Sequence, residues 1–202
     1  MREVEVKFTV SNLAAVTTTL AARNIVLAEP IFQDDQAFAP VGWSFGDSKL
    51  GVTFLRLRTV DSRHWFTLKQ PGVNAQDCLE HETEVSDREQ MHQAIVRMGY
   101  WATVRVAKSR RTGRHGEVSL CLDEVEGLGS FLELERMVPY GTPAAVVQDE
   151  LAAFVASLDL DAVRTAETYD SLVRAAQEGA VRVPSSRAST DTANTAATSS
   201  VV

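Results

Sequence analysis

Met1-Arg2-Glu3-Val4-Glu5-Val6-Lys7 opens the chain, and charged and apolar residues alternate along it. Successive side chains of a β-strand point to opposite faces, so period-two alternation is typical of a strand. Glu3, Glu5 and Lys7 would share one face, and the valines the other. A half-buried strand ordinarily keeps its charges in water. The question raised by this stretch is whether its charged face is solvated or lines an enclosed space.

The same alternation returns in later strand-like segments, each with a polar or charged face opposite an apolar one. These faces carry Arg56 and Arg58; Trp65, Thr67 and Lys69; Glu80, Glu82 and Glu84; Cys121 and Asp123; and Glu133 and Glu135. Lys108 and Arg110 also share a face, but Val104 and Val106 have the same parity. That strand is therefore the least regular.

The composition is that of a globular protein. The chain has 202 residues, 45% hydrophobic and 23% charged, enough for one domain with a sizeable core. A net charge of −7 argues against a general nucleic-acid binder. The chain has no apolar run of about 18 residues and no apolar signal core, so we expect no membrane association and a cytoplasmic location. Cys78 and Cys121 match no metal spacing and are predicted to be buried thiols.

The order of predicted elements favours an antiparallel, barrel-like α+β domain over residues 1–178. Strands are expected over residues 2–10, 31–40, 52–60, 63–70, 78–85, 100–111, 117–124 and 130–138. Helices are expected over residues 13–23, after residue 87, from residue 143 and over 165–178. Residues 179–202 are rich in Ser, Thr and Ala and lack periodicity, so we predict a disordered tail.

Two arrangements suit the charged faces. In a sandwich they would be solvated outer surfaces, which is the usual meaning of such alternation. In a closed barrel they would line a tunnel, and two observations favour this. The helices carry apolar stripes that need the apolar strand faces, and the charged faces include both cations and carboxylates. Isolated buried ions cost several kcal/mol each, so such a lining must be paired. A polyphosphate with a divalent metal would satisfy both signs.

At these residues the sequence resembles the CYTH superfamily, the triphosphate tunnel metalloenzymes. The hallmark of that superfamily, Glu-x-Glu-x-Lys, corresponds to residues 3–7. Further matches follow at residues 55–58, 67–69, 80–84, 108–111, 122–135 and 168–172. Residues 98–100 and 127–131 look most like the class IV adenylyl cyclase branch. The resemblance covers about residues 2–175, and it implies an eight-stranded antiparallel tunnel with helices packed on the outside.

The resemblance also implies a site for a triphosphate with Mg²⁺ or Mn²⁺. The implied phosphate ligands are Lys7, Arg56, Arg58, Lys69, Lys108 and Arg110. The implied metal ligands are Glu3, Glu5, Asp123, Glu133 and Glu135. Lys69 and Glu5 are the implied catalytic residues, and Glu80, Glu82 and Trp65 are further candidates. The residue types suit this chemistry, because Arg holds phosphate oxygens with paired bonds and carboxylates bind hard cations.

Two reactions are compatible with these ligands. A class IV adenylyl cyclase is a phosphorus–oxygen lyase in which the 3′-hydroxyl of ATP attacks the α-phosphorus, giving cyclic AMP and pyrophosphate. A triphosphatase instead uses water to attack tripolyphosphate, thiamine triphosphate or a nucleoside triphosphate. The branch resemblance favours the cyclase. A non-catalytic polyphosphate binder would not need the carboxylates. By resemblance, a homodimer is also plausible.

Overall fold

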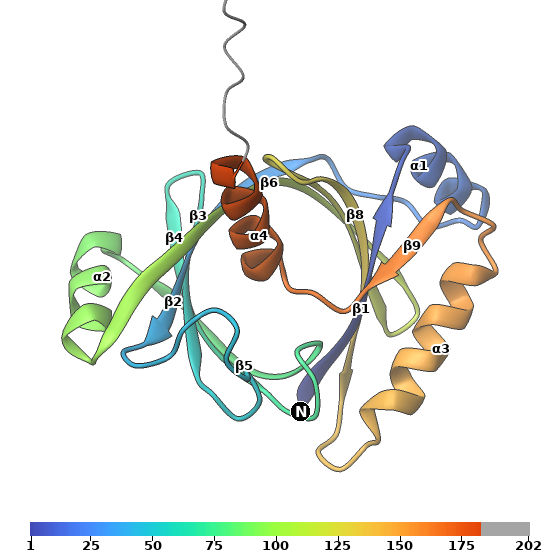
Figure 1. The fold of residues 1–202 in the computed structure, drawn as a ribbon. Coiled ribbons are helices and arrows are strands. Elements are labelled where there is room, and N and C mark those ends of the chain that lie inside the picture. The colour runs from blue at the N-terminus through green and yellow to red at the C-terminus, as the bar shows by residue number, and fades with distance from the viewer. Residues whose placement is uncertain (183–202) are drawn as a thin grey trace, which may run out of the picture.

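The computed structural model describes residues 1–182, which form a closed antiparallel β-barrel with helices packed around it (Figure 1). The barrel order is β5-β4-β3-β2-β6-β7-β8-β1, and it closes where β1 pairs with β5. Its strands are β1 (Arg2–Val10), β2 (Ile31–Pro40), β3 (Phe54–Val60), β4 (Arg63–Pro71), β5 (Asp77–Val85), β6 (Tyr100–His115), β7 (Val118–Val125) and β8 (Gly129–Val138). The predicted eight-stranded barrel is confirmed.

The main hydrophobic core lies outside the barrel, between its outer face and the helices α1 (Leu13–Ala22) and α3 (Ala144–Ala156). Val4 and Val6 on β1 are fully buried there, as the alternation predicts. Each such aliphatic side chain contributes about 1.5–3 kcal/mol by leaving water. A second cluster packs β2 and β3 against α2 (Arg88–Arg97). The apolar faces therefore point outward to the helices, and the inner face is left to the charged rows.

The last helix, α4 (Tyr169–Arg182), lies across one end of the barrel (Figure 1). Its Val173 packs with inward-facing Val104, Val106 and Phe131. This contact explains why valines and charged residues share the inward face of β6. Its inner row changes from valine to charged residues where the strand passes from beneath α4 into the charged part of the barrel.

The structure differs from the sequence expectation near the end of the described chain. Residues 162–165 form a short strand, β9 (Ala162–Thr165), which adds to β1 and was not predicted. Consequently α4 begins at Tyr169 rather than at residue 165, and it continues to Arg182. Most of the tail predicted over 179–202 lies outside the described residues. Within residues 1–182, no helix combines the length and apolar character needed to cross a bilayer.

Candidate functional site

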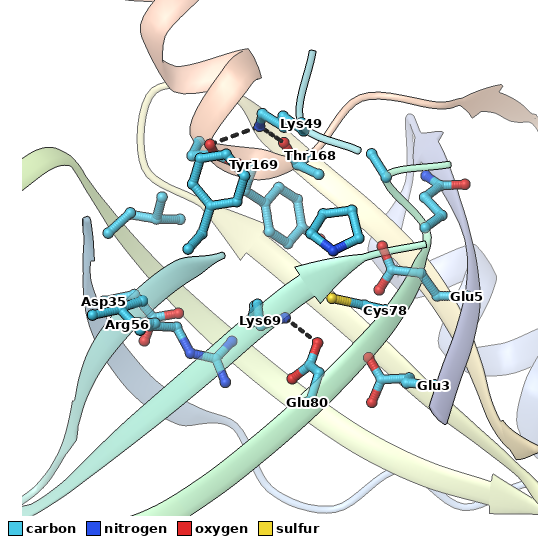
Figure 2. Close-up of a pocket in the computed structure, with 18 of the residues that line it drawn as sticks. Glu3, Glu5, Asp35, Lys49, Arg56, Lys69, Cys78, Glu80, Thr168 and Tyr169 are labelled. Carbon is cyan, nitrogen blue, oxygen red and sulfur yellow. Dashed lines mark hydrogen bonds and ion pairs between the residues drawn. The ribbon is translucent and has the colours of Figure 1, made fainter. Parts of the chain in front are cut away.

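The inner face of the barrel surrounds a cavity of about 410 Å³. Twelve of the predicted site residues line it, contributed by strands that are far apart in the sequence. They are Glu3, Glu5, Lys7, Arg56, Arg58, Lys69, Glu80, Glu82, Lys108, Arg110, Glu133 and Glu135. Figure 2 shows Arg56 on one side of the cavity and Glu3 and Glu5 on the other. The closed barrel thus brings the predicted cations and carboxylates together.

Three carboxylates gather on the acidic side. Glu3, Glu5 and Glu135 each offer an oxygen, and these oxygens lie within 4.8 Å of one another. Glu5 and Glu135 are directly opposite each other on β1 and β8. Burial, reinforced by the nearby charge of Glu135, raises the pKa of Glu3 to about 9. Burial also raises the pKa of Glu5, despite the neighbouring Lys7. Three converging carboxylate oxygens are the kind of donor set that hard divalent cations prefer.

Glu133 is held differently from these three carboxylates. Its Oε1 lies 3.1 Å from Lys7 Nζ, and its Oε2 accepts a hydrogen bond from Arg110. Burial would raise the pKa of Glu133, but Lys7 and Arg110 together hold it well below its ordinary value. Glu133 is therefore an ionised partner of two cations.

A second group of charges lies on β2, β3, β4 and β5. Arg58 donates two hydrogen bonds of 2.7 Å to the carboxylate of Asp35. Arg56 donates to Glu82 Oε2 at 2.9 Å, and Lys69 forms an ion pair with Glu80. Burial opposes ionisation of Asp35, but the hydrogen bond from Arg58 and the charge of Arg56 lower its pKa. These paired cations form the basic side of the cavity.

Asp123 does not line the cavity, but it binds three side chains that do. Its side chain is completely buried. It accepts hydrogen bonds from Lys108 Nζ at 3.1 Å, from Arg110 Nε at 2.7 Å and from the Tyr169 hydroxyl at 2.9 Å. The Tyr169 ring also lies against the ammonium groups of Lys7 and Lys108, at 4.2 and 4.7 Å from its centroid. With its oxygens taken up in this way, Asp123 fixes the cations that face the cavity.

The model of the CYTH domain family matches residues 1–169, which is most of the described chain. The protein belongs to the CYTH family. This CYTH protein is 26% identical over 162 residues to a candidate adenylate cyclase of Methanocaldococcus jannaschii, MJ0240. That match covers 79% of this chain and 91% of the archaeal protein. The predicted family is therefore confirmed.

Solved structures share the fold of this CYTH protein. A candidate adenylate cyclase from Vibrio parahaemolyticus superimposes with a TM-score of 0.70 at 22% identity, covering 86% of this chain and 98% of that one. The candidate adenylyl cyclase HpAC1 from Hippeastrum gives a TM-score of 0.58 at 18% identity, covering 87% and 96%. The Hippeastrum protein is described as having a dominant triphosphatase activity.

Several cavity residues of the CYTH protein were not predicted from the sequence, among them Asp35, Lys49 and Tyr169. Asp35 lies on β2, whose Gln-Asp-Asp-Gln run has no period-two pattern. Lys49 comes from the β2–β3 loop, and its Nζ donates to Thr168 Oγ1 at 2.7 Å (Figure 2). It also donates to Asp170 Oδ2 at 2.8 Å. Neither a loop nor a helix start carries strand periodicity. For Tyr169, the only sequence signal was the resemblance at residues 168–172.

Trp65 shares the inward parity of Lys69 but is not among the residues that line the cavity. The guanidinium carbon of Arg63 lies 5.0 Å from its ring centroid. Both cysteines are buried and free, as predicted. Burial raises the pKa of Cys78, which lines the cavity, to about 12, so its thiol stays protonated at neutral pH.

The raised pKa of Glu3 predicts that affinity for Mg²⁺ increases with pH. Below about 9 the Glu3 carboxyl retains a proton that a metal ion must displace. The affinity should therefore rise by up to about tenfold per pH unit from neutral pH towards 9 and then level off. Calorimetric titration in buffers with different ionisation enthalpies would detect the released proton. Glu3→Gln should reduce this proton release, with Glu5 still contributing because its pKa is raised as well. A pH-independent affinity in the wild type would contradict the role of Glu3.

Proposed function

We propose that this protein is a metal-dependent enzyme that converts ATP to cyclic AMP and pyrophosphate. The observation that carries the proposal is one cavity in which a cluster of three carboxylates faces a set of buried cations. Such a pair of surfaces suits a triphosphate bound together with a divalent metal. Membership of the CYTH family and the cyclase names of its relatives support the same reaction class.

In this proposal the triphosphate lies between the two sides of the cavity. Arg56, Arg58 and Lys69 would contact it from β3 and β4. Lys7, Lys108 and Arg110 would contact it from β1 and β6. Transfer at phosphorus depends mainly on positioning and on stabilising developing negative charge, which fixed cations supply. Arg side chains add directional pairs of hydrogen bonds to the phosphate oxygens.

Glu3, Glu5 and Glu135 would hold Mg²⁺ or Mn²⁺, which supplies neutralising charge and acidifies an attacking hydroxyl. The ionised Glu133 would remain paired with Lys7 and Arg110 and hold both cations in position. Burial lowers the pKa of Lys69, but Glu80 outweighs this and raises it above the ordinary value. Lys69 is therefore a permanent cation suited to transition-state stabilisation rather than to proton abstraction.

Hydrolysis of a triphosphate is the second candidate function. The observation that favours it is the dominant triphosphatase activity ascribed to the Hippeastrum relative, which shares the fold. The same cations and carboxylates would serve both reactions. The difference lies in the nucleophile, which is the substrate 3′-hydroxyl in one case and water in the other.

Product analysis tests the proposal directly. The protein would be incubated with Mg²⁺ or Mn²⁺ and, separately, ATP, tripolyphosphate and thiamine triphosphate. Cyclic AMP with pyrophosphate supports the cyclase, and orthophosphate supports the hydrolase. If none of the three substrates is converted, the protein is not an enzyme of either kind.

Removing the divalent metal should reduce turnover to background, because without a bound cation the carboxylate cluster would repel the triphosphate. Excess EDTA is the treatment, and readdition of Mg²⁺ or Mn²⁺ to restore the rate is the control. Circular dichroism would show that the barrel remains folded. Turnover that persists in EDTA would refute the metal dependence.

A further inference from the structure

The barrel closes along a short seam between β1 and β5. Two residue pairs join these strands, and the pair nearer the middle of β1 is Val4 with Asp77. Further along β1 the neighbouring strand on this side is β9, which pairs with it from Lys7 onwards. Glu5, one of the three clustered carboxylates, lies between these two pairings. The metal-binding side of the cavity therefore includes the point at which β1 changes partners.

A loop residue and a helix side chain bind the backbone of Glu5 at this point. The Glu5 N–H donates to Gln76 O at 2.8 Å, and the Glu5 carbonyl accepts from Gln148 Nε2 at 3.2 Å. Gln148, on α3, also donates to Gln76 O at 3.4 Å. Both backbone groups of Glu5 thus point away from Glu135, its opposite residue on β8. Antiparallel pairs of that kind bring their two side chains closest together.

Gln148 is a buried polar residue on the apolar side of α3. It is 5% exposed, and its helix neighbours Val147 and Leu151 belong to the main core. A buried amide costs free energy unless its hydrogen bonds are made. Asn74 Nδ2 donates to Gln148 Oε1 at 3.0 Å, and Gln148 Nε2 donates back to Asn74 Oδ1 at 3.2 Å. This reciprocal pair fixes the amide with its donor group towards Glu5.

We propose that Gln148 is a positioning residue for the metal-binding carboxylate of Glu5. Gln148 is not among the residues that line the cavity, so it acts from outside the barrel through the Glu5 backbone. This inference rests on the proposed function, in which Glu5 binds the divalent metal. Outer partners that orient metal ligands typically contribute about 10- to 100-fold to metal affinity or activity. A residue that only satisfied the Glu5 carbonyl would contribute to stability alone.

Gln148→Met separates these two roles, because methionine has a similar length but no hydrogen-bond donor. Mg²⁺ alone would be titrated into the full chain and binding followed by calorimetry. We expect Gln148→Met to bind Mg²⁺ roughly 10-fold more weakly than the wild type. Val147→Ala is the matched control, since Val147 is the preceding residue of α3 and is buried in the core. It should lower Tm and leave the Mg²⁺ affinity unchanged.

A double-mutant cycle tests whether Gln148 acts through Glu5. In a Glu5→Gln background, Gln148→Met should weaken Mg²⁺ binding much less than it does in the wild type. Asn74→Ala gives a second route that leaves Gln148 in place. It removes the partner that fixes the Gln148 amide, so it should also weaken Mg²⁺ binding.

Unchanged Mg²⁺ affinity in Gln148→Met would overturn the positioning role, and so would an equal loss in both backgrounds. If Gln148→Met does not fold, unchanged affinity in Asn74→Ala would overturn it. In these cases the proposed function would still stand, because the wild type would bind Mg²⁺ and Glu5→Gln would bind it more weakly. A wild type that does not bind Mg²⁺, or whose affinity Glu5→Gln leaves unchanged, would instead refute the proposed metal site and this inference with it.

Discussion

Glu5→Gln is expected to lower kcat/KM by about 1000-fold while leaving the barrel folded. The substitution keeps the size of the side chain but removes one of the three carboxylates whose oxygens lie within 4.8 Å of one another. Loss of a group that places charge at a reacting phosphoryl centre typically costs about 100- to 1000-fold, and here metal affinity would fall as well. Steady-state rates at several Mg²⁺ concentrations would separate weaker metal binding from slower turnover.

The same variant should be at least as stable as the wild type when no metal is added. Burial raises the pKa of Glu5 above its ordinary value of 4.5. Above pH 4.5 the unfolded chain releases this proton more readily than the folded chain, so Glu5 disfavours folding as pH rises. Gln has no proton to release, and Tm at neutral pH should therefore be unchanged or higher.

Glu84→Gln is the matched control for Glu5→Gln, because Glu84 lies on β5 and pairs with Arg63 in an exposed ion pair. Its rate and Tm should match those of the wild type. Near-native turnover in Glu5→Gln would exclude Glu5 as a metal ligand. A large drop in Tm would show that its carboxylate supports the fold instead.

Asp123→Asn is expected to destabilise the protein by about 3–5 kcal/mol, the usual effect of removing one partner from a buried ion pair. The Asp123 carboxylate is fully buried and accepts from Lys108, Arg110 and Tyr169. An amide has one acceptor oxygen and no charge, so Lys108 would lose the carboxylate that pairs with it, and Arg110 one of its three. Urea unfolding followed by circular dichroism measures the change.

Asp34→Asn provides the comparison for Asp123→Asn. Asp34 also pairs with an arginine, Arg105, but both side chains are partly exposed. Its loss should cost less than about 1 kcal/mol. If the two asparagine variants proved equally stable, the buried network around Asp123 would not be an important support of the fold.

The alternation in the first strand correctly predicted which residues share a face, although both faces of β1 are enclosed by protein. Val4 and Val6 pack outward under the helices, and Glu3 and Glu5 point inward to the cavity. Parity alone could not distinguish this from a solvated sheet. The two signs of charge and the family resemblance supported the closed barrel.

Parity was less informative where a strand extends past the site. Trp65 and Glu84 share parity with cavity residues, yet neither is among the residues that line it. Asp123 has inward parity as well but lies beneath the cations that it binds. Period-two alternation tells which face a side chain is on, but not its depth along the barrel.

Residues outside the regular strands could not be located from periodicity. Lys49 belongs to a loop, and Tyr169 to the start of a helix. Their positions depend on contacts between segments that are distant in the sequence, such as Lys49 with Thr168. The four-residue strand β9, which sets where α4 begins, is too short to give a clear pattern.

The ion pairs on the basic side of the cavity affect how metal and triphosphate influence each other's binding. Arg58, Arg56 and Lys69 are each already paired with a carboxylate of the protein. A triphosphate bound to these cations would place further negative charge beside their carboxylate partners, and a divalent metal would compensate that charge. Metal and triphosphate should therefore bind with positive cooperativity, each increasing the affinity of the other by the same factor.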